Sequence, residues 1–578
     1  MDKRWVFHPP NKSLQAEIAN KLKISHLLAQ VLINRGITDI LTARNFLQPQ
    51  ISSLGDPSLL PGIEKASVRI NDAIRKKEKI VIYGDYDVDG LSATALMYRC
   101  LRLLGAHVDY YIPERLEEGY GLNSDAIKKL KEGGADVILT VDCGINACRE
   151  AHIARECDID LIITDHHQPG CEIPDAFAIV NPKLSSSQYI FSGLSGVGIA
   201  FKLAWAIGQQ SSPQKKVSSE FKDFLLNAVG LVALGTIADV VPLLSENRIL
   251  TKYGLSALQH SEIPGIRALL DVAGLSNTTL ETFHVGYRLG PRINAPGRVS
   301  NAKIVVEMLT TTCRERALEI AGFLEQENKR RQDIQMEIME SAMGKIEKEV
   351  NMNETHSIVL ADKKWHPGVI GIIASKIVEE FNRPTVMIAI ADDLGHGSAR
   401  SIPAFHILDV LECCKEKLLS VGGHAQAAGL KILPENINEF RDMFNSATSQ
   451  KLNRTDLLPV LNIDAEVTLS MLSKALVSEL ARLSPYGEGN PVPLFAATNL
   501  RVVGQPRRIG STGKHLSFYV KQGDTALRTV AFGMGDLVDK LKQNGNMCSI
   551  VFTLKINNWM DSENLELEVK DIKFNNKH

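Results

Sequence analysis

The sequence lacks the features that mark secreted, zinc-binding and membrane-spanning proteins. Its nine cysteines include no Cys-x-x-Cys pair, which argues against a zinc ribbon and against a disulfide framework. No apolar run reaches the length of a transmembrane helix, and the opening MDKRWVFHPP has no apolar core of a signal peptide. We therefore expect a cytoplasmic protein with no membrane partner.

The chain also lacks an excess of either charge. Its 65 Lys and Arg residues against 67 Asp and Glu residues give a net charge of −2. A nucleic-acid site would therefore be a local basic patch that acids elsewhere offset. An apolar content of 44% and a charged content of 23% are typical of soluble globular proteins. A chain of 578 residues is too long to fold around a single hydrophobic core, so we expect about three to four domains.

One short stretch, residues 79–95, organises the rest of the chain. It begins with an apolar run closed by glycine, and carboxylates follow at alternate positions, Asp85, Asp87 and Asp89. The run predicts a buried parallel strand that opens a strand–helix unit, and such sheets bind ligands at the carboxyl ends of their strands. Three crowded carboxylates repel each other, so a divalent cation such as Mg²⁺ or Mn²⁺ is the natural counter-charge.

Two other interpretations of this stretch remain. A calcium EF-hand loop shares the opening acids and glycine, but its closing Glu would fall at position 96, which is Leu96. A solvated acidic turn would also account for the carboxylates. The stretch by itself leaves the acidic turn open, and the later motifs argue against it.

Two later strands end in the same kind of residue. The apolar run ADVILTV is followed by Asp142, and the run DLIIT is followed by Asp165, His166 and His167. Because the carboxyl ends of parallel strands meet at one edge of a sheet, we expect these side chains to lie close together. Asp239, near the end of a largely apolar helical stretch, is a candidate fourth carboxylate.

This set of residues predicts a centre for two metal ions. Asp87, Asp89, Asp142 and His166 could together hold both ions. Two-metal sites suit the hydrolysis of phosphodiesters, because they clamp the attacking and the leaving oxygen.

The motifs as a whole resemble those of the DHH phosphoesterase superfamily, and within it the RecJ family of single-stranded-DNA-specific exonucleases. The first four are YGDYDVDG (83–90), VDCG (141–144), TDHH (164–167) and GTIADVVPL (235–243). The later ones are GPRINAPGRVSNA (290–302), WHPGVIGIIASKI (365–377), GSARSI (397–402), GGHAQAAG (422–429) and PYGEGNPVPLF (485–495).

The resemblance implies roles for individual residues. The implied metal ligands are Asp87, Asp89, Asp142, His166 and Asp239. The implied catalytic residues are these five ligands and His167. His167 is expected to touch the scissile phosphate, Asp165 to orient its histidine neighbours, and Asp85 to support the ligands or bind weakly. The positions implied for the 5′ phosphate are Arg115, Arg298, Ser398 and Arg400.

The segment GGHAQAAG suggests a further phosphate contact. Its glycines are expected to precede a helix, where bare backbone N–H groups can face an anion. An ordinary tight turn is the alternative. His424 within the segment, together with Arg400, favours the phosphate contact, because arginine can bind phosphate through two parallel hydrogen bonds.

The expected architecture is a multidomain α/β protein. A parallel-sheet DHH catalytic lobe, a long connecting helix, a smaller DHH-associated α/β lobe and a C-terminal OB-fold β-barrel follow one another. The expected bounds are 1–75 for an N-terminal helical segment that covers the first sheet, 76–302 for the catalytic domain, 303–350 for the connecting helix with a break near 310–312, 351–452 for the second lobe and 453–578 for the barrel.

The barrel segment mixes basic and aromatic residues. These are Arg501, Arg507, Arg508, Lys514, Lys521, Arg528, Phe518, Tyr519 and Phe532. Basic groups can follow a nucleic-acid backbone while exposed aromatic rings stack on bases. The sequence leaves open which of the three aromatic residues belong to the barrel core.

The resemblance implies a 5′→3′ exonuclease on single-stranded DNA with two divalent ions, Mn²⁺ or Mg²⁺, acting in recombination, mismatch repair and fork rescue. It also implies a monomer, with a helicase and a single-strand-binding protein as candidate partners. Two alternatives are another DHH phosphodiesterase, acting on short oligonucleotides or cyclic dinucleotides, and a non-catalytic DNA-binding scaffold. The segment after position 457 disfavours the first, and the complete acid and histidine set disfavours the second.

Overall fold

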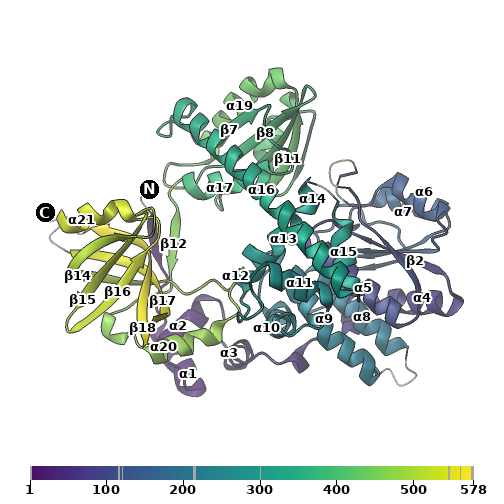
Figure 1. Ribbon diagram of the computed structural model, residues 1–578, viewed down its shortest axis with the longest axis horizontal. Coiled ribbons are helices and arrows are strands. Elements are labelled where there is room, and N and C mark those ends of the chain that lie inside the picture. The colour runs from purple at the N-terminus through teal and green to yellow at the C-terminus, as the bar shows by residue number, and fades with distance from the viewer. Residues whose placement is uncertain are drawn as a thin grey trace. The chain divides into compact units, whose positions relative to one another are not determined.

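The computed structural model describes residues 3–114, 118–119, 121–211, 216–299, 301–543, 547–559 and 562–574 (Figure 1). The chain divides into two compact units. The first unit contains Asp56–Asp239 and Tyr253–Pro459, and the second contains the residues up to Gly55, Val240–Lys252 and the residues from Val460 onward. Both units are therefore built from segments that are distant in sequence.

A five-stranded parallel sheet forms the centre of the first unit. Its strand order is β3-β2-β4-β5-β6. The strands are β2 (Lys79–Gly84), β3 (His107–Tyr111), β4 (Val137–Val141), β5 (Asp160–Thr164) and β6 (Ala178–Val180). Strands β2, β4 and β5 are almost entirely buried, as expected for a parallel sheet that helices cover on both faces. The predicted parallel sheet is confirmed.

Helices of this unit pack on the sheet and on one another. They are α4 (Ile63–Lys76), α5 (Val88–Leu103), α6 (Ser124–Glu132), α7 (Cys148–Glu156), α8 (Gly196–Gln210) and α9 (Ser219–Ala238). Helix α5 contacts both α8 and α9. Helix α9 has the length and composition of a membrane span, but 67% of that window is buried inside the protein. It is a core helix of the first unit.

Short helices lead from this region to one long helix. They are α10 (Ser245–Gln259, divided between the two units), α11 (Pro264–Val272), α12 (Thr282–His284), the π-helix η3 (Val285–Leu289), α13 (Gly290–Asn294), α14 (Pro296–Val299) and α15 (Lys303–Thr310). Helix α16 (Arg314–Glu349) then runs for 36 residues. The predicted break near 310–312 is present, because α15 ends at Thr310 and α16 begins at Arg314.

A second sheet follows α16, with strand order β10-β11-β9-β8-β7. Its strands are β7 (Ile358–Asp362), β8 (Thr385–Ala391), β9 (Leu394–Arg400), β10 (Ser420–Gly423) and β11 (Ala427–Ile432). Its helices are α17 (Ile370–Phe381), α18 (Ile407–Cys413) and α19 (Ile437–Lys451). The GGHAQAAG segment forms the β10–β11 hairpin, so the predicted helix start there is wrong. Its backbone groups pair across the hairpin and with β9.

The second unit contains the predicted barrel. Its strands are β14 (Phe495–Ile509), β15 (His515–Gln522), β16 (Thr525–Ala531), β17 (Met547–Trp559) and β18 (Ser562–Phe574). They pair in the order β14-β15-β16-β18-β17, and β14 also pairs with β17, which closes the barrel. Short elements beside it are β12 (Val460–Ile463), β13 (Ala465–Glu466), α20 (Lys474–Leu480) and α21 (Val538–Gln543). The OB-fold prediction is confirmed.

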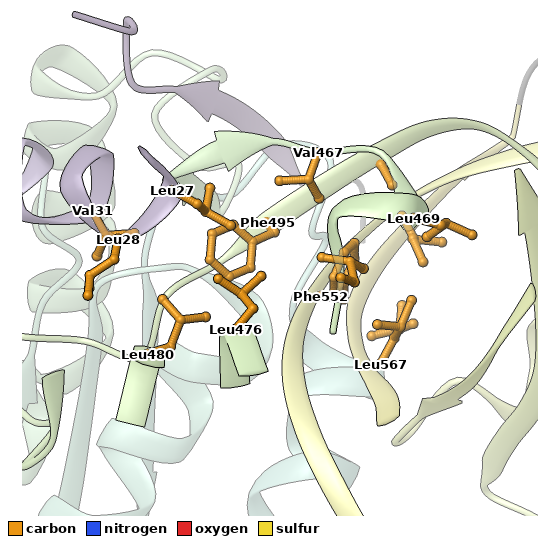
Figure 2. Close-up of a cluster of buried hydrophobic side chains, with 14 of the residues drawn as sticks. Leu27, Leu28, Val31, Val467, Leu469, Leu476, Leu480, Phe495, Phe552 and Leu567 are labelled. Atoms are coloured by element: carbon orange, nitrogen blue, oxygen red, sulfur yellow. The ribbon is translucent and has the colours of Figure 1, made fainter. Parts of the chain in front are cut away.

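The N-terminal helices pack on this barrel. They are α1 (Lys12–Leu22), α2 (His26–Asn34) and α3 (Ile40–Leu47), preceded by β1 (Arg4–Phe7), which pairs with β12. Leu27, Leu28 and Val31 of α2 share one hydrophobic core with Leu476 and Phe495 (Figure 2). The prediction that this segment covers the first sheet is therefore wrong for α1, α2 and α3, whereas α4 packs against α8 and β6 of the first unit.

Candidate active site

Two of the three carboxylates after β2 are held by backbone N–H groups at helix starts. Asp87 caps α5, because its Oδ1 accepts hydrogen bonds from the backbone N–H groups of Asp89 (2.9 Å) and Gly90 (3.1 Å). Asp89 is buried, and its two carboxylate oxygens accept from the backbone N–H groups of Gly196 (2.7 Å) and Val197 (2.9 Å). The first turn of α8 thus fixes the orientation of the Asp89 carboxylate.

Residues from two further strands and from α9 meet at the same edge. Asp142 directly follows β4, is buried, and has a left-handed φ of +64°. His166 follows β5, and its Nε2 lies 3.2 Å from Asp142 Oδ1 and 3.5 Å from Asp239 Oδ2. Asp239 is the residue at which α9 ends. The expectation that these side chains lie close together is met.

Asp165 holds both the ring and the backbone of His167. Its Nδ1 lies 2.7 Å from Asp165 Oδ1, and its backbone N–H donates to the same oxygen at 3.0 Å. The other oxygen of Asp165 accepts from the backbone N–H of Ile145 at 2.9 Å. Burial lowers the pKa of His167, but the hydrogen bond and the charge of Asp165 outweigh burial, so the net shift is upward. Asp165 thereby orients the ring of His167.

Burial makes the carboxylate cluster hard to ionise. It raises the pKa of Asp89 to about 7 and that of Asp239 to about 9, and the charge of neighbouring carboxylates adds to both shifts. Burial, together with Asp89 and Asp87, also raises the pKa of Asp142 well above its ordinary value. Burial lowers the pKa of His166 to about 3, so its ring is neutral and can act as a ligand. A bound cation would favour the ionised forms of these carboxyl groups.

The donor set fits divalent ions. Among the residues that the structure describes, Asp142 Oδ1 and His166 Nε2 are buried without a hydrogen-bond partner. In each of three groups of residues, the possible ligand atoms all lie within 4.8 Å of one another. They are Asp85, Asp87 and Asp142; Asp89, His166 and Asp239; and Asp142, His166 and His167. A donor set made mostly of carboxylate oxygens suits Mn²⁺ and Mg²⁺, and Asp142 belongs to two of the three groups.

Three of the four residues predicted to form a 5′-phosphate pocket line one cavity of the first unit. Arg298, Ser398 and Arg400 surround a space of about 520 Å³. Arg298 donates to the backbone carbonyl of Gly368 at 3.1 Å, and Arg400 donates to Ser398 Oγ at 3.2 Å. The fourth residue, Arg115, lies outside the described residues. The cavity presents two guanidinium groups and a hydroxyl, which suits an anion.

His424 does not line that cavity. It is exposed in the turn between β10 and β11 and lines a second cavity of about 450 Å³ together with Asp165 and His167. The structure therefore separates His424 from Arg400, with which the sequence grouped it. His424 instead shares a cavity with the histidine that Asp165 orients.

The structure of the barrel shows which of its three aromatic residues are buried and which are exposed. Phe518 is 2% exposed and belongs to the hydrophobic core, whereas Tyr519 is 50% and Phe532 is 56% exposed. Tyr519 stands opposite Val503 on one neighbouring strand and opposite Arg528 on the other. One exposed ring thus lies beside a basic residue on the outer surface of the barrel.

The residues that begin α8 also support the site, and none of them was predicted from the sequence. Ser195 caps this helix, because its Oγ accepts from the backbone N–H of Gly198 at 3.1 Å. The N–H groups of Gly196 and Val197 hold Asp89. A signal was present, since Ser-Gly-Val-Gly before an apolar run is typical of a helix start. Backbone donors carry no side-chain signature, so nothing linked this helix start to the acids.

Comparisons with known proteins agree with this geometry. Residues 79–229 match the DHH family, N-terminal domain, residues 353–450 match the DHHA1 domain, and residues 463–571 match the RecJ OB domain. The fold and the strand-end residues therefore define a protein of the DHH family.

Proteins with similar sequences and structures show which family of DHH proteins the chain belongs to. The chain is 37% identical over 570 residues to the single-stranded-DNA-specific exonuclease RecJ of Bacillus subtilis (strain 168), covering 98% of this chain and 70% of the relative. It is 34% identical to the RecJ of Haemophilus influenzae, covering 90% of this chain and 92% of the relative. The crystal structure of RecJ in complex with Mn²⁺ from Thermus thermophilus matches with a TM-score of 0.84 and 29% identity, covering 99% of this chain and 80% of that one. The chain belongs to the RecJ family of single-stranded-DNA-specific exonucleases.

Proposed function

We propose that this protein is a metal-dependent exonuclease that removes nucleotides from the 5′ end of single-stranded DNA. The observation that carries the proposal is the meeting of Asp142, His166 and Asp239 at the edge where β2, β4 and β5 end, with two buried ligand atoms that lack a hydrogen bond. The RecJ relatives support the substrate and the reaction class.

The ligands of two divalent ions, Mn²⁺ or Mg²⁺, are in this proposal Asp87, Asp89, Asp142, His166 and Asp239. Asp85 joins the group around Asp87 and Asp142, so it is a candidate ligand as well as a supporting residue. When bound, the ions supply an activated water and stabilise the charge that develops on the phosphate and on the leaving oxygen. The carboxylates balance the charge of the ions, and neutral His166 contributes a nitrogen ligand.

The residues around the ions bind and orient the strand. Asp165 orients the ring of His167 through a hydrogen bond at Nδ1, and in this proposal the ring contacts the scissile phosphate. His424 shares the cavity beside His167 and can contact the backbone of the strand there. These contacts would neutralise charge in the transition state.

End selection would come from the cavity lined by Arg298, Ser398 and Arg400. A terminal phosphate carries more charge than an internal one, so paired guanidinium groups favour it. Arg115, close to the carboxyl end of β3 in sequence, is the fourth member that we propose for this pocket.

In this proposal the barrel binds a further part of the strand. Exposed Tyr519 offers a stacking surface, and Arg528 beside it offers a phosphate contact. We further propose that the enzyme acts as a monomer in the cytoplasm, in recombination and repair. A helicase and a single-strand-binding protein are the candidate partners, since they would supply and present single strands.

One assay tests the proposal. Single strands labelled at the 5′ or the 3′ end, duplex DNA and RNA are incubated with the enzyme in Mn²⁺, Mg²⁺ or EDTA. We expect immediate release of the 5′ label as a mononucleotide from single-stranded DNA, late release of the 3′ label, and no release in EDTA. Early release of the 3′ label, or cleavage that persists in EDTA, would contradict the proposal.

A further inference from the structure

Two buried carboxylates stand where neighbouring glycines have no side chain. A Cβ on Gly196, the first residue of α8, would lie 2.3 Å from Asp142 Oδ1 and 2.5 Å from Asp142 Cγ. A Cβ on Gly235, in α9, would lie 2.5 Å from Asp89 Oδ1. Real Cβ atoms essentially never approach other heavy atoms within 3.0 Å. Alanine at either position would therefore displace the carboxylate or the helix.

The backbone conformation does not explain these glycines. Neither Gly196 nor Gly235 has a positive φ, and both lie in helices. Glycine destabilises a helix relative to alanine, because it loses more conformational freedom on folding. The space beside each glycine contains a carboxylate, so packing accounts for both glycines.

Gly196 contacts the site in two ways. Its backbone N–H donates to Asp89 Oδ2 at 2.7 Å, and its missing side chain leaves room for Asp142. The first turn of α8 thus touches carboxylates that follow two different strands, β2 and β4. Since any side chain at this position would separate α8 from Asp142, glycine sets how closely the two acids approach.

Gly235 leaves room for Asp89 in a similar way. It precedes Asp239 by four residues, so the two positions lie on the same face of α9. The approach of this face to Asp89 brings Asp239 to the cluster, where its Oδ2 lies 3.5 Å from His166 Nε2. A Cβ at position 235 would also lie 2.8 Å from Val197 Cγ1, so α9 could not simply shift toward α8.

We propose that Gly196 and Gly235 are positioning residues of the metal site. Their missing side chains set the separation of Asp89, Asp142 and Asp239, and hence the affinity for divalent ions. The link to metal affinity rests on the function proposed above, whereas the steric pairing of each glycine with its carboxylate does not.

The first test measures metal affinity. The full-length Gly196→Ala and Gly235→Ala variants are titrated with Mn²⁺ by calorimetry, with Gly322→Ala in α16 as the control. Gly322 is also a helical glycine, and a Cβ on it would meet no atom within 4 Å. Changes around metal ligands typically cost about 10–100-fold in affinity, so we expect at least a tenfold loss in both variants and little change in the control. Wild-type affinity in both variants would overturn the proposal.

The second test needs no metal. Asp142 has a φ of +64°, which glycine adopts readily, so Asp142→Gly removes the clashing atoms without straining the backbone. In EDTA, Gly196→Ala should lower the melting temperature of the wild type but leave that of the Asp142→Gly variant nearly unchanged, because the clash is gone. Equal shifts in both backgrounds would overturn the pairing.

The comparison of the wild-type and Asp142→Gly backgrounds remains informative if the Gly196→Ala protein fails to fold. Recovery of folding in the Gly196→Ala/Asp142→Gly double variant would support the pairing, and continued failure would overturn it. A wild type that binds no Mn²⁺ would instead contradict the proposed function, while the result of the comparison in EDTA would still stand.

Discussion

At the scale of single residues, the site is a group of buried carboxylates that depends on cations. Asp89, Asp142 and Asp239 all have a raised pKa because burial disfavours their charged forms. The sequence predicted Asp89 and Asp142 from their places shortly after apolar strands, and Asp239 from its place near the end of an apolar helical stretch. It did not predict their support by Gly196, because a backbone N–H and an absent side chain leave no such pattern.

The first prediction concerns pH. The pKa of Asp239 is about 9 in the folded protein and has an ordinary value of 3.8, so its contribution to stability is present at low pH and is lost as pH rises between these values. Metal-free protein should therefore be less stable at pH 8 than at pH 6, and Mn²⁺ should raise the melting temperature more at pH 8. Thermal unfolding in EDTA and in Mn²⁺ measures both effects.

Asp239→Asn is the control for this prediction. It removes the titrating group, so the metal-free variant should lose less stability between pH 6 and pH 8 than the wild type. An identical pH dependence in the two proteins would show that Asp239 does not carry the effect.

The second prediction concerns the proposed ligands. Asp87→Ala or Asp142→Ala should abolish hydrolysis while leaving folding and much of the DNA binding intact, because wrong metal geometry costs orders of magnitude in rate. Asp223→Ala, an exposed acid on α9, is the control and should retain full activity. Near-wild-type turnover of either ligand variant in saturating Mn²⁺ would discard the two-metal assignment.

At the scale of elements, strand geometry decides what each residue does. Strand β15 alternates, so Phe518 points into the barrel core and Tyr519 points outward. The sequence showed both rings but not which face was buried. The β10–β11 hairpin is a second example, because closely spaced glycines suit a hairpin as well as a helix start.

The third prediction follows from this alternation. Tyr519→Ala should weaken binding to long single strands by about 1–3 kcal/mol, the contribution of one stacked base, whereas Tyr519→Phe should bind like the wild type. Equilibrium binding in EDTA measures both affinities without cleavage. If Tyr519→Ala binds unchanged, this outer face of the barrel is not the path of the strand.

The fourth prediction concerns strand β9, which brings Ser398 and Arg400 to one cavity. Arg400→Ala should slow digestion from a 5′-phosphorylated end more than from a 5′-hydroxyl end, because a charged hydrogen bond contributes about 1.5–3 kcal/mol. The ratio of the two rates in the wild type and the variant is the measurement, with exposed Arg75→Ala as control. An unchanged ratio would remove Arg400 from the pocket.

At the scale of the whole molecule, the sequence predicted the kinds of domain but not how the chain divides between the two units. Local periodicity indicates which face of a helix is apolar, but it does not identify the partner of that face. The N-terminal helices share the barrel core, and Val240–Lys252 also belongs to that unit. Buried Arg248 illustrates the connection, donating to the backbone carbonyls of Phe46 (2.8 Å) and Ser484 (2.8 Å).

This division affects how the barrel can be tested. A chain cut after the second α/β lobe would lose the core on which Leu27, Leu28 and Val31 pack. Such a truncation would expose apolar surface as well as remove the DNA-binding face. Single substitutions such as Tyr519→Ala therefore separate binding from folding more cleanly.

The number of Mn²⁺ ions bound per chain shows whether the site is a two-metal centre. Equilibrium titration of the metal-free protein, followed by electron paramagnetic resonance of the free ion, counts the sites. The wild type should bind two ions, as expected for a two-metal centre, and Asp142→Ala should lose tight binding of both, because Asp142 belongs to neighbouring ligand groups. If Asp142→Ala binds two ions with unchanged affinity, Asp142 is not a ligand and the proposed two-metal centre is wrong.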